Sequence, residues 1–416
     1  MSSEMKNQLF KQLFKQPWVN IGSLGSVNDG KSTLVKVLTG IMTQKHSSEQ
    51  KRNITINQGF GNMKIWQHNN NYITTDSTTD NIENYELVNH ISFVDCPGHQ
   101  ELIKTTLGAL ELMYGAIVVI AVDQPLTMKP QLMQHLAAAK LGGIERIIIC
   151  MNKIDLVPKE VLMKRKEELD TILHKYDIIP FAIIPTCFNK NIGINYLIKA
   201  IMYLFNPMDL IKKENVGLFS ISRTFDINKP GTDWNNVMGG VIGGTLSSGT
   251  ISVGEKLEIR PGIISVTKSG TSWQPIIINI TSIKTDTTNL DFASPGGLIG
   301  LGTDLDPFYC KKNKLVGHVA GVVGMMPNVF TNINININII DTFGFTWEPK
   351  LKDNVSLKIG TNMYLSKLVQ IKDNMYTFEL NSPVCIVDMS NIIICKEIDK
   401  ILRVVAVAKL SYDSNK

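Results

Sequence analysis

The sequence predicts an α/β domain with a mostly parallel sheet, followed by two β-barrel domains. Up to about residue 207, apolar runs of strand length alternate with stretches of helical periodicity, which is typical of a parallel sheet covered by helices on both faces. Beyond residue 207, glycines, prolines and short β-rich runs replace the helical pattern, which is typical of small barrels. A break near residues 324–328 separates the two barrels. The expected divisions are a tail over residues 1–19, the α/β domain over 20–207, and barrels over 208–326 and 327–416.

Each predicted element rests on its own pattern. The run at residues 116–122 is the longest apolar run; it indicates a buried parallel strand and is far too short to span a membrane. Residues 331–340 alternate asparagine and isoleucine, which predicts a strand with one apolar and one polar face. The other predicted strands of the first domain lie at residues 19–24, 91–95, 146–151 and 181–186, and its predicted helices at residues 33–42, 102–113 and 159–176.

Composition narrows the class of protein. The 416 residues, 44% of them hydrophobic, are enough for two or three domains with their own cores. A net charge of +5 without a long block of like charges suits a protein that contacts nucleic acid over part of its surface. The six cysteines include no Cys-x-x-Cys pair and no signal peptide is evident, so we expect the cytoplasm and no membrane partner. The first 20 residues favour a packing helix or a tail over a mitochondrial presequence, which would normally contain arginine.

The sequence GSVNDGKST at residues 25–33 fits the pattern G-x-x-x-x-G-K-[ST] between a predicted strand and a predicted helix. Glycines let successive amide groups turn towards a phosphate, and the helix N-terminus adds its positive dipole end. Lys31 is predicted to neutralise the β and γ oxygens, and the Ser32 hydroxyl to bind Mg²⁺. The alternative is a glycine-rich turn that happens to precede Lys-Ser. The predicted phosphate-binding residues are Gly25, Ser26, Val27, Asn28, Asp29, Gly30, Lys31, Ser32 and Thr33.

Two further segments match parts of a phosphate switch. Asp95 ends a predicted strand and is placed to hold Mg²⁺ through water, while Gly98 offers its amide to a γ-phosphate. Thr55 lies between the phosphate loop and Asp95, where it can complete the Mg²⁺ shell only while the γ-phosphate is present. Taken alone, the Asp-x-x-Gly segment is equally compatible with an ordinary turn.

The segment Asn152-Lys153-Ile154-Asp155 predicts the base. The Asp155 carboxylate can accept hydrogen bonds from N1–H and the exocyclic amino group of guanine, which adenine does not offer in that geometry. Asn152 is assigned to the N7 and O6 edge, and the Lys153 stem to the base plane. A plain polar loop is the alternative. The four signals occur in the order and approximate spacing of a GTP-binding switch protein.

Together these segments resemble the translational GTPases, and among them the gamma subunit of eukaryotic and archaeal translation initiation factor two. The resemblance extends from about residue 19 to 410 and includes the runs RNITINQGFGNMKIW, FVDCPGHQELIKTTLGALELMYGAIVVIAVDQP, NKIDLV, VGEKLEIRPG and ASPGGLIGLGTDLDP. The segment NKPG at residues 228–231 is more specific to this subunit than the phosphate loop, which all such GTPases share.

The resemblance implies a function and partners. GTP or GDP with Mg²⁺ is the expected cofactor, and methionylated initiator tRNA, delivered to the small ribosomal subunit, is the expected ligand. Alpha and beta subunits are expected on the first barrel and the GTPase domain, together with GTPase-activating and nucleotide-exchange factors. His99 is expected to position the attacking water, with Gly98 and Mg²⁺ stabilising the developing charge.

The chain also departs from the family pattern. The family usually has His-Val-x-His in the phosphate loop; Asp29 here brings a negative charge beside phosphates, which weakens nucleotide binding or alters turnover unless the side chain turns outward. Many members carry a four-cysteine zinc knuckle between the switches, whereas residues 66–90 contain no cysteine, so we predict no zinc and a mobile loop over residues 69–81. An expected tyrosine is Phe60. The segment behind guanine, usually Ser-Ala, is Thr186-Cys187-Phe188, where the Cys187 amide can still serve.

Three functions therefore remain open at this point. The first is an initiator-tRNA carrier that turns over GTP with help. The second is a hydrolysis-impaired, nucleotide-occupied scaffold, motivated by Asp29. The third is an elongation-type carrier of aminoacyl-tRNA, which the initiation-specific segments of the barrels disfavour.

Overall fold

The computed structural model describes residues 15–42, 59–69, 71–76, 82–98, 103–206, 216–267, 270–342, 345–387, 391–398 and 401–410. The chain forms two compact units, Met1–Ile211 and Lys212–Lys416. Of the first 20 residues, predicted as a packing helix or a tail, residues 1–14 lie outside the described residues, and Val19 and Asn20 belong to the first strand.

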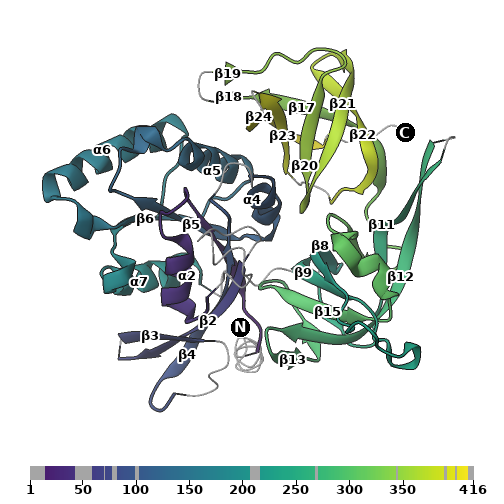
Figure 1. Cartoon of the computed structure of the whole chain (residues 1–416), viewed down its shortest axis with the longest axis horizontal. Helices are drawn as coiled ribbons and strands as arrows, with labels where there is room; N and C mark the ends of the chain where they lie inside the picture. Colours follow the sequence, from purple (N-terminus) through teal and green to yellow (C-terminus); the bar gives the residue numbers. More distant parts are fainter. Residues whose placement is uncertain are drawn as a thin grey trace. The chain divides into compact units, whose positions relative to one another are not determined.

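The first unit is built on one seven-stranded sheet with the strand order β3-β2-β4-β1-β5-β6-β7 (Figure 1). Strands β4, β1, β5, β6 and β7 are parallel, while β2 and β3 run antiparallel at one edge. The predicted mostly parallel sheet is therefore confirmed. The strands are β1 (Val19–Leu24), β2 (Gly59–His68), β3 (Asn71–Asp76), β4 (Glu86–Asp95), β5 (Gly115–Ala121), β6 (Ile147–Asn152) and β7 (Ala182–Pro185).

Burial explains why the central strands are almost entirely apolar. Every residue of β1, β5 and β6 is buried, as parallel strands covered on both faces require. Helices α2 and α7 share one core cluster with alternate strand residues, including Ile21, Ile117 and Ile148. The described α-helices are α2 (Lys31–Thr39), α4 (Ile103–Ala109), α5 (Pro130–Leu141), α6 (Lys159–Lys175) and α7 (Ile194–Leu204).

The prediction of a mobile loop over residues 69–81 is wrong for residues 71–76, which form β3. This strand pairs with β2 in a hairpin whose register joins Met63 to Asp76 at one end. The Trp66 indole Nε1 donates a hydrogen bond to Thr75 Oγ1 at 3.0 Å. Trp66 and Leu87 form a small apolar cluster against which Ile73 and other side chains pack. Tertiary packing of an aromatic side chain thus orders a segment whose composition resembles a loop.

The first barrel of the second unit closes because β11 pairs with both β16 and β12. Its core contains Phe219, Ile221 and Leu257, all completely buried. The barrel strands are β8 (Leu218–Phe225), β9 (Val241–Ser248), β11 (Lys256–Thr267), β12 (Gly270–Thr285), β15 (Ile299–Thr303) and β16 (Val319–Val322), with β13 (Thr288–Leu290) beside β12 and a short β10 (Ile251–Ser252) paired with β14 (Phe292–Ala293).

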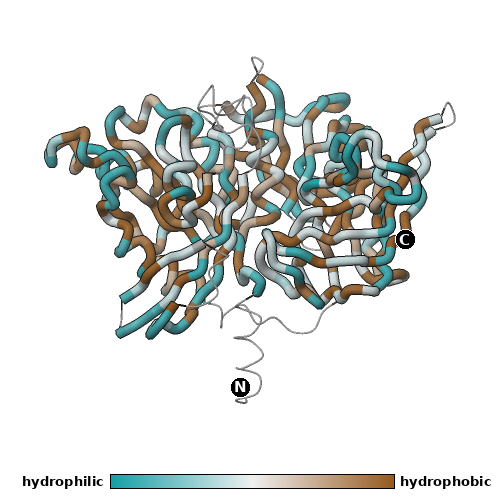
Figure 2. The backbone as a smooth tube through the Cα atoms, turned by 60° about the horizontal axis from the view of Figure 1, so that its bottom comes forward, coloured by the Kyte–Doolittle hydropathy of each residue, from teal (hydrophilic) through white to brown (hydrophobic). Residues whose placement is uncertain are grey.

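The second barrel closes through the pairing of β17 with both β22 and β24. The predicted alternation along β17 is confirmed, because Ile333 and Ile335 are buried while the asparagines beside them are exposed. The barrel strands are β17 (Val329–Ile339), β20 (Asn354–Ile359), β21 (Asn362–Lys372), β22 (Met375–Cys385), β23 (Asn391–Ile398) and β24 (Ile401–Leu410), and a short pair, β18 (Asp341–Thr342) and β19 (Phe345–Thr346), follows β17. Figure 2 shows hydrophobic and hydrophilic stretches alternating along the chain in both units.

The two barrels are joined by specific bonds and by an apolar cluster. The Thr361 hydroxyl donates to the Ile221 carbonyl at 2.6 Å, and the Tyr364 hydroxyl donates to the Gly317 carbonyl at 3.3 Å. Val319, Met326 and Cys385 are buried together in a cluster drawn from both barrels. These contacts make the second unit a single packed body, in agreement with its compactness.

None of the helices in the described ranges is long and apolar enough to cross a membrane. All six cysteines are free and buried.

Replacing Ile335 with alanine is expected to lower the free energy of unfolding of the second barrel by about 2–5 kcal/mol, because a fully buried side chain is lost and a cavity remains. Asn336→Ala, on the exposed face of the same strand, is expected to change it by less than about 0.5 kcal/mol. Both changes in stability can be measured by urea unfolding of the full chain, monitored by hydrogen exchange of the amides in β17 and β22. Equal losses from the two variants would contradict the assignment of the two faces.

Candidate nucleotide-binding site

The backbone of the loop between β1 and α2 has positive φ angles at three positions. Gly25, Asn28 and Gly30 have φ angles of 139°, 63° and 105°. A Cβ at Gly25 would lie 2.2 Å from the Val119 carbonyl oxygen, and one at Gly30 would lie 2.4 Å from Asn152 Nδ2. Since both approaches are shorter than any real Cβ contact, glycine is required at these two positions. The predicted cradle thus forms in the predicted context, after a buried strand and before a helix.

Lys31 is the first residue of α2 and is 6% exposed. Its Nζ donates a hydrogen bond to the Ser26 carbonyl at 2.7 Å, so the side chain folds back over the loop. Burial lowers the pKa of Lys31, while the neighbouring carboxylates of Asp29 and Asp95 act in the opposite direction. The loop therefore holds an ammonium group at the N-terminal end of a helix, which is a favourable place for phosphate oxygens.

Asp95 ends β4 directly beside β1 and is completely buried. Its carboxylate accepts hydrogen bonds from the Ser23 hydroxyl at 2.8 Å and from the Ser32 hydroxyl at 2.7 Å. A hydroxyl and a carboxylate within hydrogen-bond distance form an oxygen donor set that fits Mg²⁺, which in nucleotide sites takes only one or two carboxylates together with waters and phosphates. Among the described residues no cluster of three His, Cys, Asp or Glu side chains could hold a metal unaided.

Gly98 lies against the phosphate loop. A Cβ at this position would be 2.8 Å from Val27 N and 2.8 Å from the Ser26 carbonyl carbon, so a side chain here would collide with backbone. The structure therefore brings the Asp95–Gly98 segment next to the cradle, as the motif predicts. Thr55 and His99, predicted for the metal shell and for catalysis, lie outside the described residues.

Asn152, the last residue of β6, connects the predicted guanine segment to the phosphate loop and is 4% exposed. Its Nδ2 donates to the Asp29 carbonyl at 2.9 Å, and its Oδ1 accepts the Phe188 N–H at 3.2 Å. The sequence assigns this side chain to the base, whereas the structure places both ends of its amide on neighbouring loops. Asn152 therefore fixes the spacing between three loops of the site.

The two charged residues of the guanine segment are both paired. Lys153 has a φ angle of 64°, and its Nζ lies 3.0 Å from Asp123 Oδ2. Asp155 Oδ2 lies 3.0 Å from Lys190 Nζ. The Cys187 thiol and the Lys190 ammonium group hold the pKa of Asp155 below its usual range. Asp155 is therefore ionised at neutral pH and presents a hydrogen-bond acceptor.

The segment after β7 lies beside the guanine segment. Thr186 is completely buried, and its N–H donates to the Met151 carbonyl at 2.8 Å. Cys187 and Ile192 form an antiparallel bridge in which the Cys187 N–H donates to the Ile192 carbonyl at 3.1 Å. The Cys187 amide, predicted to support guanine, is thus engaged within its own turn. Phe188 is 2% exposed and forms part of the core.

Comparison with known proteins bears directly on this site. The family described as the elongation factor Tu GTP-binding domain matches residues 16–207, and the C-terminal family of initiation factor eIF2 gamma matches residues 341–410. Subunit gamma of eukaryotic translation initiation factor 2 from Encephalitozoon cuniculi is 34% identical over 91% of this chain and 89% of its own. Its counterpart from Methanocaldococcus jannaschii is 36% identical over 90% of this chain and 93% of its own. The chain belongs to the gamma-subunit family of translation initiation factor 2.

Solved structures agree on the fold of this family member. A bacterial selenocysteine-specific elongation factor EF-Sec superposes with a TM-score of 0.72 at 19% identity, covering 96% of this chain and 60% of that longer chain. Elongation factor SelB from Methanococcus maripaludis, in complex with a GTP analogue, gives a TM-score of 0.70 at 19% identity over 95% of this chain and 79% of its own. As a gamma-subunit family member the chain is a translational GTPase.

Asp29 is the main departure of this gamma-subunit family member in the phosphate loop, and it does not turn outward. It is completely buried, and its carboxylate accepts a hydrogen bond from the Ser26 N–H at 2.7 Å. Lys129, just before α5, forms an ion pair with it at 2.6 Å. Phe60, which stands where the family pattern has a tyrosine, lies in β2 opposite Val94.

Two residues of the site, Lys129 and His135, are missed by sequence reasoning. His135 lies in α5, and its Nδ1 accepts a hydrogen bond from the Gly25 N–H at 3.1 Å. Burial, and then the charge of Lys31, lower the pKa of His135 to about 3, so the ring is neutral and able to accept. Neither residue belongs to a local motif, and both reach the loop from about a hundred residues away.

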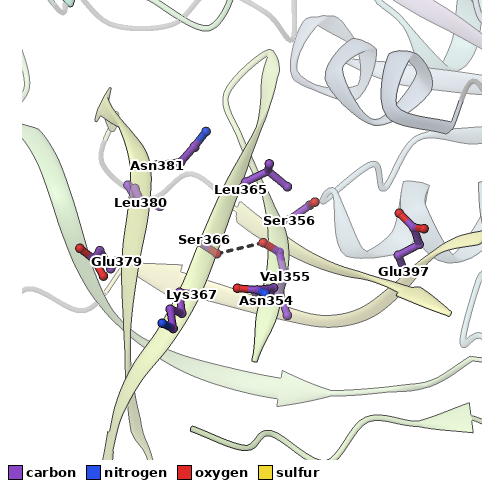
Figure 3. A pocket seen from close by; sticks show the side chains of 10 residues that line it. All are labelled: Asn354, Val355, Ser356, Leu365, Ser366, Lys367, Glu379, Leu380, Asn381 and Glu397. Carbon is purple, nitrogen blue, oxygen red and sulfur yellow. Dashed lines mark hydrogen bonds between the residues drawn. The ribbon is translucent and has the colours of Figure 1, made fainter. Parts of the chain in front are cut away.

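A separate pocket of about 480 Å³ lies against the second barrel (Figure 3). Two of the lining residues are hydrogen-bonded to each other, since the Ser366 hydroxyl donates to the Val355 carbonyl at 3.2 Å. None of the residues that line this pocket is predicted to contact the nucleotide. The lining residues are Asn354, Val355, Ser356, Leu365, Ser366, Lys367, Glu379, Leu380, Asn381 and Glu397.

The contribution of His135 to stability depends on pH. Its pKa is near 6.5 in an unfolded chain and about 3 in the folded one, so the unfolded chain binds more protons between these values. This contribution is complete above about pH 6.5 and is lost as the pH falls towards 3. Between about pH 7.5 and pH 5, the wild type is expected to lose about 2 kcal/mol more stability than His135→Asn, which keeps an acceptor without titrating.

Urea unfolding at the two pH values, monitored by hydrogen exchange of the amides in β1 and β5, measures the stability of this domain. Subtracting the variant from the wild type removes the contribution of the other histidines. Parallel pH profiles for the two proteins would contradict a neutral, hydrogen-bonded His135.

Proposed function

We propose that this chain binds GTP with Mg²⁺, captures methionylated initiator tRNA in the GTP state and delivers it to the small ribosomal subunit, hydrolysing GTP on start-codon selection. The observation that supports this most directly is the meeting of three loops: the phosphate loop, the Asp95–Gly98 segment and the guanine segment around Asn152. Membership of the gamma-subunit family supplies the context of translation initiation.

In this proposal the loop amides of residues 25–33 and the Lys31 ammonium group hold the phosphates. Ser32, Thr55 and Asp95 would hold Mg²⁺, Asp95 through water, and the metal would neutralise the charge that develops on the β- and γ-phosphates. Gly98 donates its amide to the γ-phosphate, and His99 orients the attacking water.

The base is recognised as guanine. The ionised Asp155 accepts from N1–H and the exocyclic amino group, Lys153 lies along the base plane, and the turn of Thr186, Cys187 and Phe188 supports the base from behind. Asn152 supports the same site by holding the Asp29 and Phe188 backbones.

Partners follow from the family by analogy. Alpha and beta subunits would bind the first barrel and the GTPase domain, and separate factors would stimulate hydrolysis and nucleotide exchange in the cytoplasm.

The alternative function, a hydrolysis-impaired scaffold, depends on the charge of Asp29. Since that carboxylate is buried and paired with Lys129, the loop retains its attraction for phosphates and the cycling carrier is favoured.

Asp155→Asn is expected to weaken GDP binding at least tenfold, which corresponds to about 1.4 kcal/mol. The same variant is expected to gain affinity for xanthosine diphosphate, because the asparagine amide can donate to the C2 carbonyl that xanthine carries in place of the amino group. Competition against a fluorescent GDP measures both affinities.

Asp170→Asn serves as the matched control, since Asp170 lies on α6 and pairs with exposed Lys166. The control is expected to retain the preference of the wild type for GDP. If Asp155→Asn keeps that preference as well, recognition of the base by Asp155 is wrong.

Dissociation constants for methionylated initiator tRNA test the proposed carrier itself. With a nonhydrolysable GTP analogue the wild type is expected to bind at least tenfold more tightly than with GDP, about 1.4 kcal/mol. Elongator methionyl-tRNA is the control and is expected to bind more weakly. Equal, weak binding in both nucleotide states would favour the scaffold.

A further inference from the structure

The phosphate loop contains a buried ion pair that joins it to a distant part of the same domain. Asp29 Oδ1 lies 2.6 Å from Lys129 Nζ, and the two side chains are 0% and 8% exposed. Lys129 Nζ also donates to the Ala121 carbonyl at 2.7 Å. The pair therefore connects the phosphate loop, the end of β5 and the residue that precedes α5.

The Asp29 carboxylate accepts hydrogen bonds from three donors. Oδ1 accepts from Lys129 and, at 3.2 Å, from the Ala121 N–H, while Oδ2 accepts the Ser26 N–H at 2.7 Å. A buried carboxylate with an ammonium partner and two amide donors has its charge compensated inside the protein. Removing the ammonium group alone would leave an uncompensated negative charge beside the cradle.

Both backbone polar groups of Ser26 are hydrogen-bonded. Its N–H is held by Asp29, and its carbonyl accepts from Lys31. The Asp29 carbonyl in turn accepts from Asn152. Asp29 raises the pKa of Lys31 and Lys129 lowers it, so both members of the pair act on the lysine of the phosphate loop.

We propose that Asp29 and Lys129 act as a matched pair of positioning residues: Lys129 neutralises Asp29, and together they hold the phosphate loop in the conformation that accepts a nucleoside di- or triphosphate. This inference rests on the proposed nucleotide binding. Lys129 compensates for the acidic residue in the loop, and each member of the pair is harmful without the other.

The test is a double-mutant cycle on the full chain, made of Asp29→Asn, Lys129→Met and the double variant, and read by the dissociation rate of a fluorescent GDP and of a fluorescent nonhydrolysable GTP analogue. Asp29→Asn alone leaves a buried ammonium group without its carboxylate and is expected to accelerate GDP dissociation. Lys129→Met is expected to accelerate GDP dissociation at least tenfold. The penalty is expected to be larger for the GTP analogue, because the unpaired carboxylate repels the additional phosphate charge. Lys129→Arg, which keeps the charge, is expected to recover most of the loss.

Asp29→Asn combined with Lys129→Met removes both charges and is expected to dissociate GDP within about threefold of the wild-type rate, so the two effects are not additive. Lys166→Met is the matched control, since Lys166 pairs with Asp170 on the exposed face of α6. It is expected to match the wild type for both nucleotides.

Several outcomes would overturn the pairing. They are equal rates for Lys129→Met and Lys166→Met, an equal penalty for GDP and the GTP analogue, and a double variant as impaired as Lys129→Met. If Lys129→Met does not fold, the double variant decides: near-wild-type dissociation supports the pair, and dissociation more than tenfold faster overturns it. A wild type that binds no GDP would instead refute the proposed nucleotide binding and is distinguishable from every result above.

Discussion

The close approach of three backbone segments around the phosphate loop is the constraint on which the rest of the site depends. Gly25 lies against β5, Gly30 against Asn152, and Gly98 against the loop itself, each with less room than one additional carbon atom needs. A site packed this tightly leaves little room for water around a buried charge. Any charged residue that enters the loop therefore requires a partner inside the protein, and Asp29 has one.

Most of the fold can be predicted from the sequence because the patterns that indicate its elements are local. Alternating burial in β17, the apolar run of β5 and the glycines of the phosphate loop are each visible within a dozen residues, and the structure has all three. Strand β3 was missed because its asparagine- and threonine-rich sequence resembles a loop. Its order comes from pairing with β2 and from the Trp66 indole, neither of which local composition reveals.

The site was predictable where chemistry is encoded in a motif and unpredictable where it arises from tertiary contact. Lys31, Asp95 and Gly98 occupy the neighbourhood that their motifs imply. Lys129 and His135 carry no motif, yet each donates to or accepts from the phosphate loop across about a hundred residues. The sequence shows that Asp29 brings a charge into the loop, but only the fold shows that this carboxylate is buried and paired with Lys129.

The packing of the two barrels in the second unit limits which parts of the chain can change conformation when a nucleotide binds. Hydrogen bonds from Thr361 and Tyr364, together with the cluster around Met326, join the two barrels into one body. Rearrangement between the barrels would break these bonds and expose buried apolar surface, which makes them a poor switch. In the first unit, the Ser32 hydroxyl links the phosphate loop to Asp95 by one hydrogen bond, and Asn152 links it to the guanine segment by another. In the proposed GTP cycle, the difference between the two nucleotide states therefore originates in the first unit, and the barrels present a surface of fixed shape to their ligands.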